Sequence, residues 1–259
     1  MTELLATLTA VTGQTEVWLW SAFLVFCRVG AVMALMPGFG EQLVPSRIRL
    51  VLTLAFTAVI GPAIVPQIQP SSGAFFMPVA VEVVAGLVLG IGLRLFIMAL
   101  QMAGMIMAQA TSLAQLFGGM GQDPQPAIGH LMVTAGLALA VMSGLHVRAA
   151  ELMILSYTIL PPGRLPSPAD MAQWGLAEIG RAFALAFMLA APFTIAALIY
   201  NVALGVINRA MPQLMVSFVG APALTLGGLV LLAIVAPLAL AFWLIEFNAF
   251  IGNPFMSRP

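Results

Sequence analysis

The chain has 259 residues, of which 62% are hydrophobic and 7% are charged, and its mean hydropathy is +1.09. Soluble domains carry about 25% charged residues, so this composition excludes a soluble globular protein and predicts a polytopic membrane protein. Nine Arg balance nine Asp and Glu, Lys is absent, and Cys27 is the single cysteine. These counts argue against a nucleic-acid-binding surface, an internal disulfide and a cysteine metal cluster.

Six apolar blocks are long enough to cross a bilayer, which takes about 20 residues of helix. In chain order they are Val17–Met36, Ile48–Val65, Phe75–Leu100, Ala127–His146, Arg181–Ile207 and Ser217–Ile245. A further stretch, Val147–Leu160, is amphipathic and is too short and too charged to be expected to span. Proline and glycine turns separate the blocks, and no charged or serine-rich linker divides them. We therefore expect an all-α membrane protein with one domain over residues 1–259.

Arginines in the loops do not fix an orientation of this chain in the membrane. Arg47 and Arg49 favour a cytoplasmic first loop, but simple alternation then places Arg148 and Arg164 outside, against the positive-inside rule. No basic segment precedes Arg28, so a cleaved signal peptide is not expected. A chain that does not follow the rule need not consist of simple alternating hairpins.

Charged residues lie deep in two of the apolar blocks: Arg28 in the first, Glu82 and Arg94 in the third. Charges at this depth usually face a partner or a water-filled cavity. Glu82 and Arg94 cannot pair on one helix, because 12 positions leave them about 120° apart around its axis. An ion pair between Arg28 and Glu82 on different helices is one expectation, and extension of either side chain to the membrane surface is the other. Arg148 and Glu151 have the spacing of a same-helix pair.

Small residues and methionines recur at helical spacing. Gly86 and Gly90 share one face of the third block, and Gly136, Ala140 and Gly144 share a face further along, which predicts close packing against other helices. The fourth and seventh positions after Met98 are Met102 and Met105, with Met107 nearby. These methionines are either adaptable core filling or a soft lining that can yield to a passing chain.

The stretch Gln101–Pro126 differs from the blocks around it, and we interpret it as the working part of the protein. It begins as a Met-rich helical pattern that includes Gln109, and continues into a run with three glycines before Asp123-Pro124. Consecutive glycines weaken a helix. A polar segment at membrane depth is tolerated only where protein or a water-filled path surrounds it.

A second break is expected after the fifth block, at Asn208, Arg209, Pro212 and Gln213. Pro212 lacks the N–H that a continuing helix needs, and it disfavours helical geometry at Met211. Asn208 and Gln213 can hydrogen bond to the exposed carbonyls of the break. The segment therefore predicts a structural corner.

Catalytic groups are absent from the sequence. There is no HExxH zinc motif and no nucleotide-binding GxxxxGK[ST]. Ser143 and His146 lie on one helix without the surroundings of a serine protease. We expect no enzyme activity, no metal and no cofactor.

Three stretches, spread over nearly the whole chain, carry a distinctive pattern of turns and polar residues. The first contains Phe26–Gly30, Pro37–Gly40 and Val44–Leu50, and the second contains Ala203–Leu214 and Phe218–Pro222. The third joins Glu82, Gly86, Gly90, Gly104, Gln109, Asp123, Pro124, Ser143–His146 and Leu160–Gly163. Together they resemble the FliR/YscT/SpaR-type family, the R component of the flagellar and type III secretion export gate.

This resemblance implies a place in a membrane assembly. FliR-like chains form bent helical hairpins packed with FliP-like and FliQ-like export components in a helical hetero-oligomer, beside an FlhB-like component, in the flagellar basal body of the bacterial inner membrane. The pore of this export gate passes unfolded secreted flagellar proteins, and the R component supplies a loop that plugs it. By position, that loop belongs to Gln101–Pro126. The residues expected to form the plug or gate are Met105, Gln109, Leu113, Leu116, Phe117, Gly118, Gly119, Met120 and Gly121.

Two alternatives remain open from the residues. The chain could be a secondary transporter or channel for a small solute, with Arg28, Glu82 and Arg94 as its polar site, although no internal repeat supports this. The glycine-rich segment could also be an ordinary surface loop. The presence or absence of co-purifying hydrophobic proteins would separate a gate component from a transporter. We expect the chain to be stable only inside a hetero-oligomer, because it has two small-residue faces and charges that lack partners in the same chain.

Overall fold

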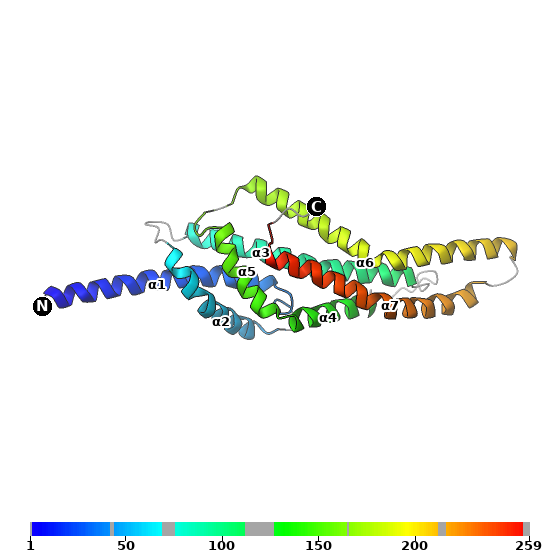
Figure 1. The fold of residues 1–259 in the computed structure, drawn as a ribbon, viewed down its shortest axis with the longest axis horizontal. Coiled ribbons are helices and arrows are strands. Elements are labelled where there is room, and N and C mark those ends of the chain that lie inside the picture. Colours follow the sequence, from blue (N-terminus) through cyan, green and yellow to red (C-terminus); the bar gives the residue numbers. More distant parts are fainter. Residues whose placement is uncertain are drawn as a thin grey trace. The chain divides into compact units, whose positions relative to one another are not determined.

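The computed structural model describes residues 2–41, 44–68, 76–111, 127–164, 166–211 and 216–255, with side chains from residue 15 onward except 67 and 216–223 (Figure 1). The described residues form α-helices joined by short turns, so the expectation of an all-α protein is confirmed. The helices are α1 Thr2–Leu35, α2 Ser46–Ile64, α3 Phe76–Thr111, α4 Ala127–Met142, α5 Leu145–Ile159, α6 Pro168–Ala210 and α7 Val216–Gly252, with a short 3-10 helix η1 at Val65–Gln67.

Five of these helices are long and apolar enough to cross a membrane, and a sixth span results if α4 and α5 count as one bent pair. This agrees with the six apolar blocks of the sequence. Several helices extend beyond their blocks, because polar residues can lengthen a helix without adding hydropathy. The clearest case is α6, which begins at Pro168 rather than at Arg181, with Asp170 in its first turn. Proline and an acidic residue both suit a helix N-terminus.

The fourth block, expected to run from Ala127 to His146, is interrupted near its end at Gly144, and α5 begins at Leu145. This glycine has φ of +84°, in the left-handed region, and it ends α4 before α5 begins. Glycine reaches this conformation without the steric penalty of a Cβ atom. Both segments therefore become helical, with a bend between them.

The chain divides into two compact units. Unit 1 comprises Met1–Arg94, Gly144–Gly175 and Ala249–Pro259, and unit 2 comprises Leu95–Ser143 and Leu176–Asn248. Each of α3, α6 and α7 contributes residues to both units, so neither unit is one continuous stretch of the sequence. The organisation as one domain stays a prediction.

In unit 1, the small residues of α3 pack against α1. A Cβ atom added at Gly86 would lie 2.4 Å from the carbonyl oxygen of Arg28, and one added at Gly90 would lie 2.9 Å from the Cβ of Leu35. Near the end of the chain, the indole N–H of Trp174 donates a hydrogen bond of 2.9 Å to the carbonyl of Pro254. The glycine face expected to pack against another helix does so, and its partner is a helix of the same chain.

In unit 2, the second half of α3 packs against α4 and α7. A Cβ atom added at Gly104 would lie 2.3 Å from the Cα of Gly129, so the backbones of α3 and α4 meet there. The indole N–H of Trp243 on α7 donates a hydrogen bond of 2.9 Å to the carbonyl of Phe96 on α3. The Trp243 ring also stacks on Phe247, with ring centroids 5.0 Å apart. Unit 2 therefore has a core of aromatic residues and glycines.

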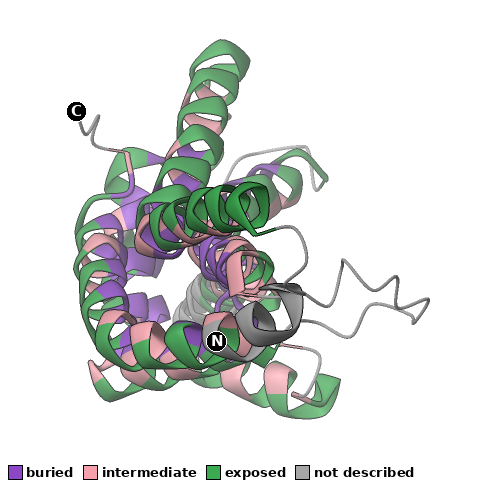
Figure 2. Ribbon diagram, turned by 90° about the vertical axis from the view of Figure 1, so that its right-hand side faces the viewer, coloured by how far each residue is buried: buried purple, intermediate pink, exposed green. Residues whose placement is uncertain are grey.

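Exposed residues, green in the ribbon of Figure 2, lie along several helices, and many of them are large and apolar. Examples are Leu19, Val59, Phe187 and Leu238, each more than half exposed. Along the second half of α6, no side chain of residues 194–211 is buried. Such surfaces suit contact with lipid or with the helices of another membrane protein.

Candidate functional site

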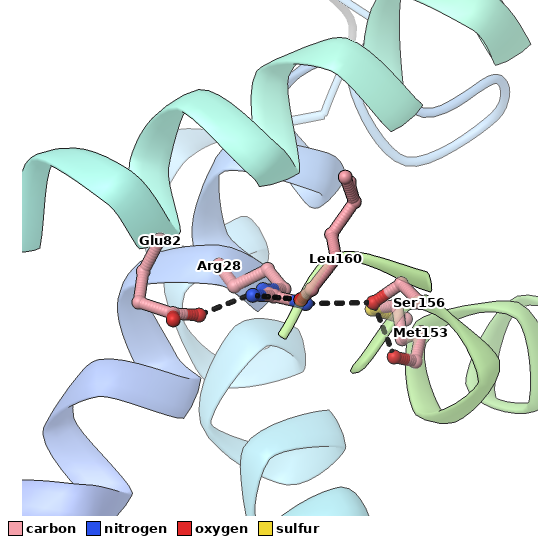
Figure 3. Close-up of polar contacts among 5 residues, drawn as sticks. All are labelled: Arg28, Glu82, Met153, Ser156 and Leu160. Atoms are coloured by element: carbon pink, nitrogen blue, oxygen red, sulfur yellow. Dashed lines mark hydrogen bonds and ion pairs between the residues drawn. The ribbon is translucent and has the colours of Figure 1, made fainter. Parts of the chain in front are cut away.

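The most strongly buried charges of the described residues are Arg28 on α1 and Glu82 on α3. Arg28 lies between α3 and α5 (Figure 3). Its Nε donates to Glu82 Oε2 at 2.7 Å, its Nη1 to Ser156 Oγ at 3.2 Å and its Nη2 to the carbonyl oxygen of Leu160 at 3.0 Å. The guanidinium carbon also lies 3.7 Å from the ring centroid of Tyr157. We call these five residues the Arg28 centre.

Burial makes this arrangement energetically demanding. The side chains of Arg28 and Glu82 are both 0% exposed, so neither charge is hydrated and each depends on its protein partners. Removing one member of a buried ion pair costs about 3–5 kcal/mol, because the other charge is left uncompensated. The guanidinium contacts three elements of the chain, whereas Glu82 Oε1 accepts no hydrogen bond from the described residues. Arg28 is therefore the hub of the centre and Glu82 is its counter-charge.

The structure thus forms the ion pair expected between Arg28 and Glu82, and neither side chain extends to a surface. Arg94 pairs instead with Glu41, at 2.7 Å between Nη1 and Oε1, with both side chains partly exposed. The prediction of an ion pair between Arg148 and Glu151 within α5 is wrong. Arg148 and Glu151 are described and exposed, and they form no ion pair with each other.

A second polar cluster, which the sequence did not reveal, holds the turn after α1. Arg49 on α2 donates from Nε to the carbonyl of Phe39 at 3.3 Å, and from Nη2 to the carbonyls of Glu41 at 3.0 Å and Val44 at 3.4 Å. Arg94 is bound to the side chain of Glu41 in the same turn. The signal that could have found this cluster is the Pro-Gly turn itself, which leaves backbone carbonyls without helical donors.

Three methionines and a glutamine follow one face of α3: Met98, Met102, Met105 and Gln109, here called the Met–Gln face. Met98 is 46% exposed and Met105 is 37% exposed, Gln109 is also exposed, and Met102 is half-buried. The opposite face is buried at Ile97, Leu100, Ala103 and Met107. Core filling within this chain is therefore the wrong interpretation for Met98 and Met105, although it holds for Met107.

The remaining predicted plug residues follow α3 in the sequence and lie outside the described residues. These are Leu113, Leu116, Phe117, Gly118, Gly119, Met120 and Gly121. Their role as a plug stays a prediction.

At the expected corner, α6 ends at Ala210 and Met211 is no longer helical, as expected from the position of Pro212. Asn208 and Arg209 are exposed on the last turn of α6. Pro212 and Gln213 lie outside the described residues, so the role of these four residues as a structural corner stays a prediction.

No group of three or more His, Cys, Asp or Glu side chains within the described ranges could hold a metal ion. Ser143 donates a hydrogen bond to the carbonyl of Ala140, and His146 is exposed. The polar side chains that join helices to one another and to turns are those around Arg28 and Arg49.

Comparison with known proteins gives consistent matches along the chain. Residues 19–250 match the family described as bacterial export proteins, family 1. The flagellar biosynthetic protein FliR of Caulobacter vibrioides is 34% identical over 225 residues, which cover 85% of this chain and 90% of the relative. The proteins of the same name from Escherichia coli and Aquifex aeolicus are each 28% identical, over 87% and 86% of this chain and 87% and 88% of their own lengths.

Proposed function

Because the chain belongs to the family of bacterial export proteins, family 1, we propose that it is a component of a flagellar type III export apparatus in the bacterial inner membrane. The observation that carries this proposal is the family match over residues 19–250, together with the name that the relatives bear. The five apolar helices long enough to span a membrane support the location. The buried polar side chains of the Arg28 centre are bound to one another, and the proposed role is transport without catalysis.

The finer proposal is that the chain assembles with FliP-like and FliQ-like components into an export pore, beside an FlhB-like component. The second half of α6 supports it, because Asn201, Asn208 and Arg209 are exposed there among apolar residues. Amide and guanidinium groups are poorly accommodated by lipid tails, whereas neighbouring helices can hydrogen bond to them. Other membrane helices are therefore the proposed neighbours of this surface, with the polar groups in their interfaces.

Co-purification tests this assembly. The tagged chain, expressed from its native operon and extracted in mild detergent, should retain at least two other hydrophobic export components in a fixed ratio. Recovery of the chain alone, or only as a homo-oligomer, would favour a solute transporter. The structure already disfavours the polar site of that alternative, because Arg28 and Glu82 are fully buried and bound to each other.

We further propose that the segment after α3 plugs the pore when no cargo passes. The Met–Gln face supports this, because Met105 and Gln109 are exposed just before the segment begins. Apolar side chains at a constriction exclude water and ions. Methionine adds an unbranched, polarisable side chain that can repack around an unfolded flagellar polypeptide of any sequence.

Deleting residues 113–121 should leave the assembly largely intact and make the membrane permeable to small ions, with export retained or only partly reduced. The measurement is ion leakage in cells that carry the deletion, alongside the amount of assembled complex. A matched variant of normal length, with Leu113, Leu116, Phe117 and Met120 replaced by Ser, separates the seal from the length of the loop. An assembled complex that stays tight in both variants would reject the plug.

A further inference from the structure

We propose that Arg28 is a positioning residue, which holds the C-terminal end of α5, and with it the connection into α6, against α1 and α3. The contacts that carry this inference are the two hydrogen bonds from Arg28 to Ser156 Oγ and to the Leu160 carbonyl. These partners are 128 and 132 residues away in the sequence. The ion pair with Glu82 supplies the counter-charge that lets the guanidinium remain buried.

The end of α5 needs a donor from outside its own chain segment. The last carbonyls of a helix lack intrahelical partners and are often satisfied by the N–H groups of the residues that follow. Here the two residues after Leu160 are Pro161 and Pro162, which have no N–H to donate to the last turn of α5. The Arg164 N–H, which could reach the Leu160 carbonyl, donates to the Pro161 carbonyl at 3.4 Å instead. Gly163 then turns the chain with φ of +74°. Arg28 Nη2 provides the donor to the Leu160 carbonyl that no backbone N–H of the described residues provides.

Ser156 extends this support one turn back along α5. Its hydroxyl donates to the carbonyl of Met153 at 2.6 Å, so its oxygen is free to accept from Arg28 Nη1. The guanidinium is planar and presents its donors in fixed directions, so one side chain can hold Glu82, Ser156 and Leu160 together. A lysine ammonium has no such fork and could not reproduce the three contacts.

A residue that serves only to stabilise packing can be distinguished from one that positions the α5 end. A buried ion pair is often replaced by apolar side chains without loss of stability. In Arg28→Met/Glu82→Met both charges disappear. In Arg28→Glu/Glu82→Arg the ion pair is kept, but the arginine is on α3 and the glutamate on α1. Both variants remove the Arg28 N–H groups that donate to Ser156 and Leu160, and neither variant leaves one buried charge without its partner.

The direct readout is a distance measured by electron paramagnetic resonance between nitroxide labels in the assembled complex. In a Cys27→Ala background, one pair of labels at Arg164→Cys and Leu50→Cys reports on the connection after α5. A control pair at Leu19→Cys and Leu50→Cys reports on α1 and α2. All three label positions are exposed and belong to unit 1.

In both double variants, the distance distribution between positions 164 and 50 should broaden at least about twofold, and export should fall about tenfold, as for loss of a hydrogen bond to a charged group. The distribution of the control pair should stay narrow. Ser156→Ala removes one contact and no charge, so it should broaden the first distribution to a smaller extent even if a double variant fails to assemble.

An unchanged 164–50 distribution in Ser156→Ala and in any double variant that assembles would overturn the proposal. So would an Arg28→Met/Glu82→Met variant whose 164–50 distance and export both equal those of the parent chain. The export measurement rests on the proposed function of the chain, whereas the distance measurement does not. A broadened distance with no effect on flagellar export would therefore leave the positioning role in place and count against the export role.

Discussion

At the scale of single residues, the two glycines where α3 and α4 cross, Gly104 and Gly129, have different amounts of space around them. A Cβ atom at Gly104 would lie 2.3 Å from the backbone of Gly129, but one at Gly129 would have no neighbour closer than 3.8 Å. The first distance is too short for any real contact, and the neighbouring atom is backbone, which cannot rotate away. Two glycines at the same crossing therefore have different tolerance to a methyl group.

Gly104→Ala should destabilise unit 2 by about 1–3 kcal/mol, the usual effect of overpacking, despite the higher helix propensity of Ala. Gly129→Ala is the matched control and should be neutral or slightly stabilising. The measurement is the thermal stability of the purified complex carrying each variant. Equal effects of the two substitutions would contradict the crossing.

At the scale of helices, the bend between α4 and α5 depends on Gly144. Its φ of +84° is unfavourable for every residue with a Cβ atom, and its carbonyl accepts the first backbone hydrogen bonds of α5, from Val147 at 3.0 Å and Arg148 at 3.2 Å. The break is therefore set by one residue at the junction of two apolar segments.

Gly144→Ala should destabilise the chain by about 1–2 kcal/mol, the cost of a left-handed conformation for an L-residue. Ser143→Ala, at the preceding position, has no positive φ to accommodate and should have a smaller effect. Thermal unfolding of the complex measures both. If Gly144→Ala is as stable as the parent, the turn does not require the left-handed conformation.

Helix positions could be predicted from the sequence because apolar runs and proline or glycine turns act locally. The Arg28–Glu82 pair could also be anticipated, since Glu82 and Arg94 point in different directions around α3. The contact of Arg28 with the Leu160 carbonyl could not, because a backbone carbonyl has no signature in the sequence. The orientation of Met98 likewise required the structure, since periodicity identifies a face without saying what covers it.

At the scale of the whole molecule, the main question is how many of the charged groups and packing faces of the chain find their partners within the same chain. Charges without partners were one sequence-based reason to expect a chain that is stable only in a hetero-oligomer. That reason is wrong, because Arg28 and Arg94 have acidic partners in the same chain. The small residues at Gly86 and Gly90 also pack within it. The remaining reason is the second half of α6, where no side chain of residues 194–211 is buried.

Expression of the chain without other export components should therefore still give an aggregated or proteolysed product, with early cleavage in the second half of α6. Size-exclusion chromatography in mild detergent and mass spectrometry of the fragments would measure this. Co-expression with FliP-like and FliQ-like components is the control and should protect the same segment. A monodisperse, intact monomer would show that lipid or detergent alone is enough to cover α6.

The exposure of the Met–Gln face has a consequence in sulfur chemistry. Thioethers in contact with water are oxidised to sulfoxides by peroxide, whereas those in a packed interior are shielded from it. In the assembled complex, aqueous peroxide should oxidise Met98 and Met105 if this face borders the export path, and should spare Met107, which is 0% exposed. Met188 on α6, 59% exposed, is the comparison residue, and it should stay reduced if lipid covers it. Peptide mass spectrometry of the treated complex, repeated with a polypeptide stalled in the pore, would reveal whether passing cargo shields these two sulfurs.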